Sequence, residues 1–235
     1  DHPYTTMSFP AEAQIARELM KFAANKLLYR GSKPVMWSVV EKTALAEAEI
    51  EYEDYTSDTV WVKFPVIQIE PKAKFEGENI DEWDRIWKRT SVVIWTTTPW
   101  TLPANLAIAI NAASTYVVVR ILREGVEKRI ILAEARIAAF CAATGAESLG
   151  VERTFLGAEL VDKVAQHPFL PRTSTIYAGD FVTLDTGTGC VHIAPGHGED
   201  DYALGRAHHL ALLSPVDDLG KYTEECGLPE LVGKY

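Results

Sequence analysis

Short runs rich in Val, Ile, Tyr and Trp recur through the middle of this 235-residue chain, and they constrain its fold most. The clearest runs are residues 91–95, 106–110, 116–122 and 128–132. Branched and aromatic residues favour extended backbone, so each run predicts a short strand. The last two runs are joined through residues 123–126, which include a glycine and predict a β-hairpin.

Outside these runs the sequence predicts further strands and three helices. More extended segments are expected at residues 33–40, 48–55 and 59–69, with a turn at 56–58, and near 181–185. Helices are expected at residues 8–30, with Ser8 as N-cap and Pro10 in the first turn, at 133–143 and at 200–212. The polar residues 71–90 are expected to form a surface excursion. Many short strands with few helices predict a mainly β fold with peripheral helices (α+β), built on a closed or partly open β-barrel core.

The charge and hydropathy of the chain exclude several function classes. With 23 Lys and Arg against 33 Asp and Glu, the net charge is −10. No broad nucleic-acid surface is therefore expected, and any such contact is local or made by other parts of a larger protein. No apolar run approaches the roughly 18–20 residues that span a bilayer. The N-terminus has neither a signal-peptide pattern nor an initiator Met, so we expect a cytoplasmic piece of a longer polypeptide.

The three cysteines, Cys141, Cys190 and Cys226, lie far apart and form no Cys-x-x-Cys pair. This spacing argues against a disulfide framework or a cysteine zinc site and fits a reducing compartment. Cys190 stands in an apolar run, so we expect it to be a packing residue rather than a nucleophile.

Three consecutive threonines, Thr96, Thr97 and Thr98, follow directly on one expected strand, with two prolines close behind them. Thr favours strands and Pro ends them, so structure alone can explain the segment. A threonine hydroxyl also donates and accepts hydrogen bonds, and Asn105 adds an amide. The segment could therefore line a polar wall, and both interpretations stay open.

Residues 187–201 combine four glycines, two histidines and three carboxylates. Glycines let the backbone turn tightly and approach a ligand. Imidazoles and carboxylates are the usual side chains of binding and proton-transfer sites. We therefore expect this segment to hold a small polar molecule.

The histidines and carboxylates of this segment allow two kinds of site. His192, His197 and Asp200 could bind a metal, but His-x4-His without a third imidazole at helical spacing is not a known zinc pattern. Acidic residues also favour the first turn of a helix, which explains Glu199 and Asp200. Asp201, if it faces the loop, could instead hold a cationic group such as an ammonium.

Residues 95–105 (WTTTPWTLPAN) and 187–202 (GTGCVHIAPGHGEDDY) together resemble the two signature segments of the editing (CP1) domain inserted in bacterial-type isoleucyl-tRNA synthetase. Residues 33–38, 43–52 and 62–65 resemble the same enzyme, so the similarity covers nearly the whole chain. The leucyl and valyl enzymes carry an Arg within or after the threonine run, which this chain lacks. Some relatives have a Cys-x-x-Cys pair near residue 37, and its absence here removes the expectation of zinc at that point.

The resemblance implies one editing domain over residues 1–235 with connecting segments at both ends, a fragment of a larger synthetase, and the β-barrel typical of isoleucyl, valyl and leucyl editing domains. It implies hydrolysis of mischarged Val-tRNA(Ile), with valyl-adenylate as a further candidate substrate and isoleucine excluded by size. Isoleucine and valine differ by one methylene, which is worth only about 1–3 kcal/mol of binding free energy, a value known for the isoleucyl enzyme. One binding step therefore discriminates too little between the two amino acids.

The site that the resemblance implies consists of Thr96, Thr97, Thr98, Asn105, His192 and Asp201. Asp201 would hold the α-ammonium of the substrate. The threonines would line the side-chain pocket and bind the terminal adenosine or the attacking water, and Thr97 and Thr98 would join Asp201 as the catalytic residues. His192 would shape the pocket that rejects the larger side chain, and Asn105 would support the loop. The general base stays open, since a ribose hydroxyl of the substrate could take part.

The expected partners are the 3′ end of tRNA(Ile) carrying valine and the rest of the synthetase, with no membrane, and we expect a monomer. No cofactor, catalytic metal or covalent intermediate is expected in this domain, because ATP and Mg²⁺ serve the full-length enzyme. Two alternatives remain: a non-catalytic aminoacyl- or adenosine-binding module, and a metal-dependent hydrolase.

Overall fold

The computed structural model describes residues 3, 5–68, 87 and 89–235 of the chain. The chain divides into two compact units, residues 1–33 and 34–235. The expectation of one domain with connecting segments at both ends stays a prediction.

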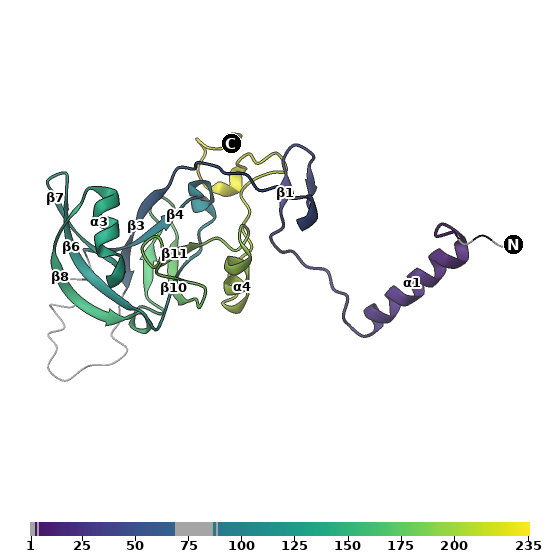
Figure 1. Ribbon diagram of the computed structural model, residues 1–235, viewed down its shortest axis with the longest axis horizontal. Helices are drawn as coiled ribbons and strands as arrows, with labels where there is room; N and C mark the ends of the chain where they lie inside the picture. Colours follow the sequence, from purple (N-terminus) through teal and green to yellow (C-terminus); the bar gives the residue numbers. More distant parts are fainter. Residues whose placement is uncertain (1–2, 4, 69–86, 88) are drawn as a thin grey trace. The chain divides into compact units, whose positions relative to one another are not determined.

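The first unit contains helix α1, Phe9–Ala24, which begins after Ser8 as predicted (Figure 1). It ends earlier than the predicted residue 30, because Asn25 caps it. The side-chain Nδ2 of Asn25 donates to the Lys21 carbonyl at 2.9 Å, and Lys26 then turns to a φ of 58°. None of the side chains of α1 is buried within the described residues.

The second unit is mainly β. Its strands are β1 Trp37–Ser38, β2 Thr43–Ala44, β3 Val60–Gln68, β4 Thr90–Thr96, β5 Ala107–Ile110, β6 Thr115–Arg123, β7 Val126–Ala133, β8 Glu147–Leu156, β9 Val164–Gln166, β10 Thr173–Ala178 and β11 Cys190–Ile193. Its helices are α3 Ile137–Thr144, α4 Glu199–Ala207 and the 3-10 helices η1 Glu47–Glu49, η2 Pro99–Ala104, η3 Glu134–Arg136, η4 Gly157–Glu159 and η5 Glu224–Cys226. No described helix has the length and apolar character needed to cross a membrane.

Nine of the described strands form one mixed sheet in the order β11-β5-β10-β9-β3-β4-β7-β6-β8. The pairs β5–β10 and β4–β7 are parallel, and the other neighbours are antiparallel. Strand β11, at one end of the order, also lies beside β4 without pairing with it. The strands from β11 to β4 therefore curl into a partly open barrel, and β7, β6 and β8 extend the sheet beyond it (Figure 1). The predicted fold class is confirmed.

Three apolar clusters hold this unit together. The first fills the barrel and includes Phe64, Ile94 and Ile108. The second lies under α3, where Phe140 meets residues of β4, β6 and β7. The third includes Ile193 of β11 and Leu204 of α4, so it fixes α4 against the strand that precedes it. Burial of such side chains is the main favourable term for folding.

The predicted hairpin is confirmed as β6 and β7, with Arg123 paired to Val126. Glu124 and Gly125 between them have φ values of 52° and 74°. Two consecutive positive φ angles are the mark of the tight turn whose twist suits antiparallel strands. The strands predicted at 91–95 and 106–110 are likewise confirmed as β4 and β5.

Other local predictions were wrong. The strand predicted at residues 48–55 does not form: residues 48–49 lie in η1, and residues 50–55 are irregular and almost all exposed, so their β-forming composition finds no partner. Residues 181–185 are also irregular, because Arg136 binds the carbonyls of Leu184 and Asp185 where a strand would bind a neighbouring strand. The strand lies instead inside the glycine-rich segment, as β11. The surface excursion predicted at 71–90 lies mostly outside the described residues.

Candidate functional site

The sheet brings the threonine segment and the glycine-rich segment together. After β4 the chain turns at Thr97 and Thr98, forms η2 and returns as β5. Strand β11 pairs antiparallel with β5, and His192 lies opposite Ile108. The two segments, far apart in sequence, therefore share one end of the barrel (Figure 1).

His192 is the centre of a buried hydrogen-bond network between these segments. Its Nε2 lies 2.9 Å from Thr101 Oγ1, and its Nδ1 lies 3.4 Å from Asn105 Nδ2. Asn105 is fully buried, and its Oδ1 accepts a hydrogen bond of 2.6 Å from Ser174 Oγ. Its Nδ2 also donates to the Ala107 carbonyl at 2.8 Å.

These contacts fix the protonation state of His192. Because Ser174 donates to Asn105 Oδ1, the Asn105 amide nitrogen faces His192 and donates to Nδ1. Nε2 then carries the proton and donates to Thr101, whose hydroxyl donates to the Thr98 carbonyl at 2.9 Å. Burial, and then repulsion from His197 and His167, lowers the pKa of His192 to about 4. His192 is therefore neutral near pH 7, and both ring nitrogens are occupied.

Three side chains from other parts of the fold hold η2 in place through its carbonyls. His167 donates to the Leu102 carbonyl at 3.0 Å, and Tyr222 donates to that of Trp100 at 2.7 Å. Arg172 donates to the carbonyl of Pro103. His167 is buried and accepts a hydrogen bond from Leu170 N at Nδ1, and burial lowers its pKa to about 4. These three side chains therefore anchor η2, the segment that joins β4 to β5.

The three predicted threonines differ in environment. Thr96 is buried, and its hydroxyl accepts a hydrogen bond from the Thr98 N–H at 3.1 Å. The hydroxyls of Thr96 and Thr98 lie 3.2 Å apart. Thr97 and Thr98 are exposed, and no hydrogen bond of the Thr97 hydroxyl is present among the described residues. Thr97 and Thr98 can therefore meet a ligand from solvent, whereas Thr96 shapes the turn.

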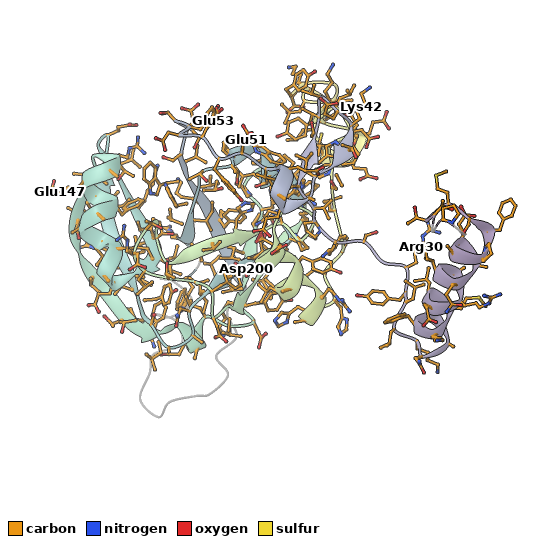
Figure 2. All side chains as sticks on the ribbon, turned by 45° about the vertical axis from the view of Figure 1, so that its right-hand side comes forward. Arg30, Lys42, Glu51, Glu53, Glu147 and Asp200 are labelled. Carbon is orange, nitrogen blue, oxygen red and sulfur yellow. The ribbon has the colours of Figure 1, made fainter. Side chains whose placement is uncertain are left out.

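Asp201 lies in the first turn of α4 and is half-buried. Burial raises the pKa of its carboxyl to about 6. A hydrogen bond from the backbone of Ala194 lowers this pKa, and the negative charge of Asp200 raises it further. The neighbouring Asp200 is exposed at the start of the same helix (Figure 2). Asp201 is thus a desolvated carboxylate with no cationic side chain paired to it in the described part of the chain.

Gly198 makes room for that carboxylate. A Cβ at this position would lie 2.4 Å from Asp201 Oδ2, closer than nonbonded atoms approach. Gly196 is equally constrained, since a Cβ there would lie 2.3 Å from the Leu213 carbonyl oxygen. Two of the glycines in the segment therefore permit close packing around Asp201 and the turn before α4.

His197 differs from His192 in having a free ring nitrogen. Its Nε2 is buried and has no hydrogen-bond partner among the residues described. Its ring meets the edge of Trp100 at 5.1 Å between centroids, and burial lowers its pKa. A neutral imidazole with a free nitrogen can accept from or donate to a bound ligand.

The alternative metal site finds no support in this geometry. In the part of the chain that is described, no group of three His, Cys, Asp or Glu side chains could hold a metal ion. His192 in addition has both nitrogens in protein hydrogen bonds. Cys190 is fully buried, and burial raises the pKa of its thiol, so its predicted role in packing is confirmed.

Sequence reasoning missed several residues of the site. Thr101 lies within the threonine segment, and its spacing of three residues from Thr98 could have indicated the turn that joins them. Ser174 and Arg136 had no local signal, because each reaches the site from a distant strand or helix end. Arg136 donates to the Gly187 carbonyl at 3.0 Å and so fixes the start of the glycine-rich segment.

Comparison with known protein families shows which family this chain belongs to. The family described as tRNA synthetases class I (I, L, M and V) matches residues 1–199. The chain belongs to this family. Its curated relatives confirm the resemblance to isoleucyl-tRNA synthetase that the two signature segments carry.

Three of these relatives are isoleucine–tRNA ligases. The enzyme of Macrococcus caseolyticus is 44% identical over 100% of this chain and 24% of its own length. That of Desulfotalea psychrophila is 43% identical over 97% and 23%, and that of Bradyrhizobium diazoefficiens is 46% identical over 100% and 24%. The chain thus spans about a quarter of the length of the relatives that it matches.

Solved structures include weaker likenesses. The crystal structure of GlLeuRS-CP1 has a TM-score of 0.49 at 19% identity, covering 63% of this chain and 59% of that chain. The editing domain of P. knowlesi cytosolic leucyl-tRNA synthetase has a TM-score of 0.44 at 15% identity, covering 54% of each chain. At TM-scores below 0.5 these likenesses assign neither fold nor function.

Proposed function

We propose that this chain is the post-transfer editing domain of an isoleucine–tRNA ligase and hydrolyses mischarged Val-tRNA(Ile). The observation that carries this proposal is the Asp201 carboxylate, desolvated and without a cationic partner in the described residues, at the end of a segment that also packs on the threonine turn. The family and the isoleucine–tRNA ligase relatives support the setting. Valyl-adenylate is a second substrate to test.

Asp201 binds the α-ammonium of the substrate in this proposal. A carboxylate whose pKa is raised to about 6 is still mostly ionised at pH 7, but it lacks the solvation that water would give. An ammonium restores that stabilisation through a charge-assisted hydrogen bond. Every aminoacyl ester carries this amine, so Asp201 recognises the class of substrate and not the side chain.

His192 acts as the wall that excludes isoleucine. It is only 7% exposed, and its hydrogen bonds to Thr101 and Asn105 hold the ring in one orientation. A fixed, neutral ring excludes a larger side chain by its volume and does not compete with Asp201 for the ammonium. Its occupied nitrogens also argue against a role as general base.

Hydrolysis then needs a positioned water and no covalent nucleophile. Thr97 and Thr98 hold the terminal adenosine or the water, and the free Nε2 of His197 is a further contact for either. The water attacks the ester carbonyl carbon, the bond to the ribose oxygen breaks, and valine and the free ribose hydroxyl leave. Because positioning alone can supply several kcal/mol, a metal is not needed in this scheme.

The remaining partners follow from the same proposal. The 3′ end of tRNA(Ile) supplies the ester, and the rest of the synthetase adjoins the domain. The exposed apolar side chains of α1, among them Ile15, Leu19 and Phe22, are candidates for that contact. The monomeric state and the cytoplasmic location stay part of the proposal.

A non-catalytic module that binds an aminoacyl or adenosine group is the second candidate. The net charge of −10 favours it, because an acidic domain attracts tRNA poorly on its own. Binding without turnover above a spontaneous control would select this candidate.

Deacylation of Val-tRNA(Ile) by the chain, with and without a chelator, tests the proposed function. We expect turnover that survives chelation. In Asp201→Ala the rate should fall on the order of 100-fold, because the substrate ammonium loses its carboxylate, and a charge left without its partner in a buried site costs about 2–5 kcal/mol. Asp200→Ala removes the same charge from the exposed neighbour and is the matched control, with activity close to wild type. Full activity of Asp201→Ala would overturn the role of Asp201.

A further inference from the structure

A cavity of about 460 Å³ lies at the other end of β4 from the candidate site. Ser91 near the start of β4 lines it, about 17 Å along the strand from Thr96 at the rate of ~3.4 Å per residue. The other lining residues are Lys63, Arg89, Glu127, Lys128 and Arg129. Four cationic residues thus line one cavity in a chain whose net charge is −10.

The carboxylates near this cavity are already engaged by arginines. Arg129 holds Glu152 in a bidentate pair at 2.7 and 3.0 Å. Arg120 lies 3.3 Å from Glu152 and 3.4 Å from Glu127. The two lysines of the cavity are left without a carboxylate partner among the described residues.

Those two lysines, Lys63 and Lys128, approach each other across β4. Lys63 of β3 pairs with Val93, and Ser91 pairs with Ile130 of β7, so the pleat places Lys63, Ser91 and Lys128 on one face of the sheet. Burial, followed by hydrogen-bond contact with Lys128 and its charge, lowers the pKa of Lys63. Like charges that meet on one face of a sheet repel each other, so a counter-charge from a ligand would relieve the arrangement.

The lining also indicates the chemistry of the ligand. It offers ammonium and guanidinium groups, one hydroxyl and one carboxylate, that of Glu127, which Arg120 engages, and it contains no aromatic ring on which a base or sugar could stack. Such donors suit the oxygens of phosphate. The volume lies within the roughly 300–1,000 Å³ of small-ligand pockets.

We propose that this cavity is a phosphate-binding site in which Lys63, Lys128 and Arg89 bind phosphate oxygens and Ser91 donates to them. The phosphate groups come from an RNA backbone or from a free polyphosphate, which share this chemistry. The site is separate from the candidate editing site and does not rest on the proposed function.

Binding of tripolyphosphate and of uncharged tRNA to the 235-residue chain tests the site. The variant is Lys63→Gln with Lys128→Gln, and the charge-matched control is Lys33→Gln with Lys234→Gln, two exposed lysines elsewhere. We expect the control to bind tripolyphosphate like wild type and the cavity variant to bind at least tenfold more weakly. Equal binding by the two variants, or no binding by wild type, would overturn the proposal.

The tRNA arm separates the two sources of phosphate. If RNA uses the cavity, the slope of log affinity against log salt falls by about two in the cavity variant, one for each lysine lost. If tripolyphosphate binding alone is lost and the tRNA slope is unchanged, the ligand is a free polyphosphate. Both results support a phosphate site, and both are independent of deacylation.

Thermal unfolding keeps the test informative if binding is lost through misfolding. Without added anion, the cavity variant should unfold no earlier than wild type, because the repulsion between the lysines is gone. Tripolyphosphate should raise the unfolding temperature of wild type and control but not of the cavity variant. A variant that is less stable without anion would show that the lysines serve the fold, and it would contradict the proposal.

Discussion

His192 and Asp201 lie nine residues apart on one segment, and burial perturbs both. Every polar atom of His192 has a partner, from Thr101 at Nε2 and Asn105 at Nδ1. Asp201 has one backbone hydrogen bond, from Ala194, and no cation beside it in the described residues. A satisfied buried group supports the structure, whereas a partly buried charge without a cationic partner reduces stability and so points to a ligand.

The two groups should affect stability oppositely as the pH falls. The folded-state pKa of His192, about 4, is below its ordinary 6.5, so its contribution is complete above pH 6.5 and is lost as the pH falls toward 4. The pKa of Asp201, about 6, is above its ordinary 3.8, so its cost is complete above pH 6 and is relieved as the pH falls toward 3.8.

Replacing His192 should give the largest change in the comparison. His192→Ala removes the ring that excludes isoleucine, so hydrolysis of Ile-tRNA(Ile) should rise by about 10- to 200-fold, the value of one methylene in such a pocket. The measurement is deacylation of Ile-tRNA(Ile) beside Val-tRNA(Ile).

Thr101→Val is the matched control for His192→Ala. It removes the hydrogen bond to Nε2 but opens no space, so it should lower the free energy of unfolding by about 1–3 kcal/mol and leave isoleucine excluded. If Thr101→Val accepts isoleucine as readily, the volume of His192 does not determine specificity.

Gly198→Ala should lower the rate of deacylation by displacing the Asp201 carboxylate, and it should leave His192 in place. The new Cβ would lie 2.4 Å from Asp201 Oδ2, so the carboxylate must move. A displacement near 1 Å costs up to about 100-fold in rate, and we expect a loss between tenfold and that limit. In the double variant with Asp201→Ala the losses should not add, because both act through one carboxylate. Additive losses would place the effect of Gly198 elsewhere.

The pH dependence of deacylation should follow Asp201. Since the substrate ammonium needs the ionised carboxylate, kcat/KM should fall as the pH drops through about 6 and be about tenfold lower at pH 5 than on the plateau. Asp200→Asn should move the midpoint down, because the charge of Asp200 helps to raise the pKa of Asp201. A midpoint near 4, the ordinary value of an aspartate, would show that the pKa of Asp201 is not raised and would contradict the prediction.

Local patterns predicted those elements whose sequence and surroundings agree. The β6–β7 hairpin follows from branched residues around a two-residue turn containing Gly125. Residues 181–185 are also rich in strand-forming side chains, but they form no strand, because the side chain of Arg136 binds the carbonyls of Leu184 and Asp185. Strand pairing depends on which partner is within reach, and sequence windows do not contain that information.

The candidate site was predictable only in part, because sequence windows do not show which distant residues reach it. The two segments that meet were both identified from their residue types, and His192 and Asn105 do contact each other. Their partner Ser174 comes from β10 through a crossing of the sheet that no local pattern indicates. The lysine pair was also missed, because Lys63 and Lys128 are each ordinary surface residues until the sheet aligns them.

The central claim is that the fold keeps the Asp201 charge at a cost in stability, for a cationic ligand. The thermal unfolding of Asp201→Asn at pH 7 without substrate tests it most directly. A pKa raised from 3.8 to about 6 corresponds to about 1–3 kcal/mol, so we predict that the variant is more stable than wild type by that order. A variant less stable than wild type would show that the carboxylate serves the fold, and it would contradict the account.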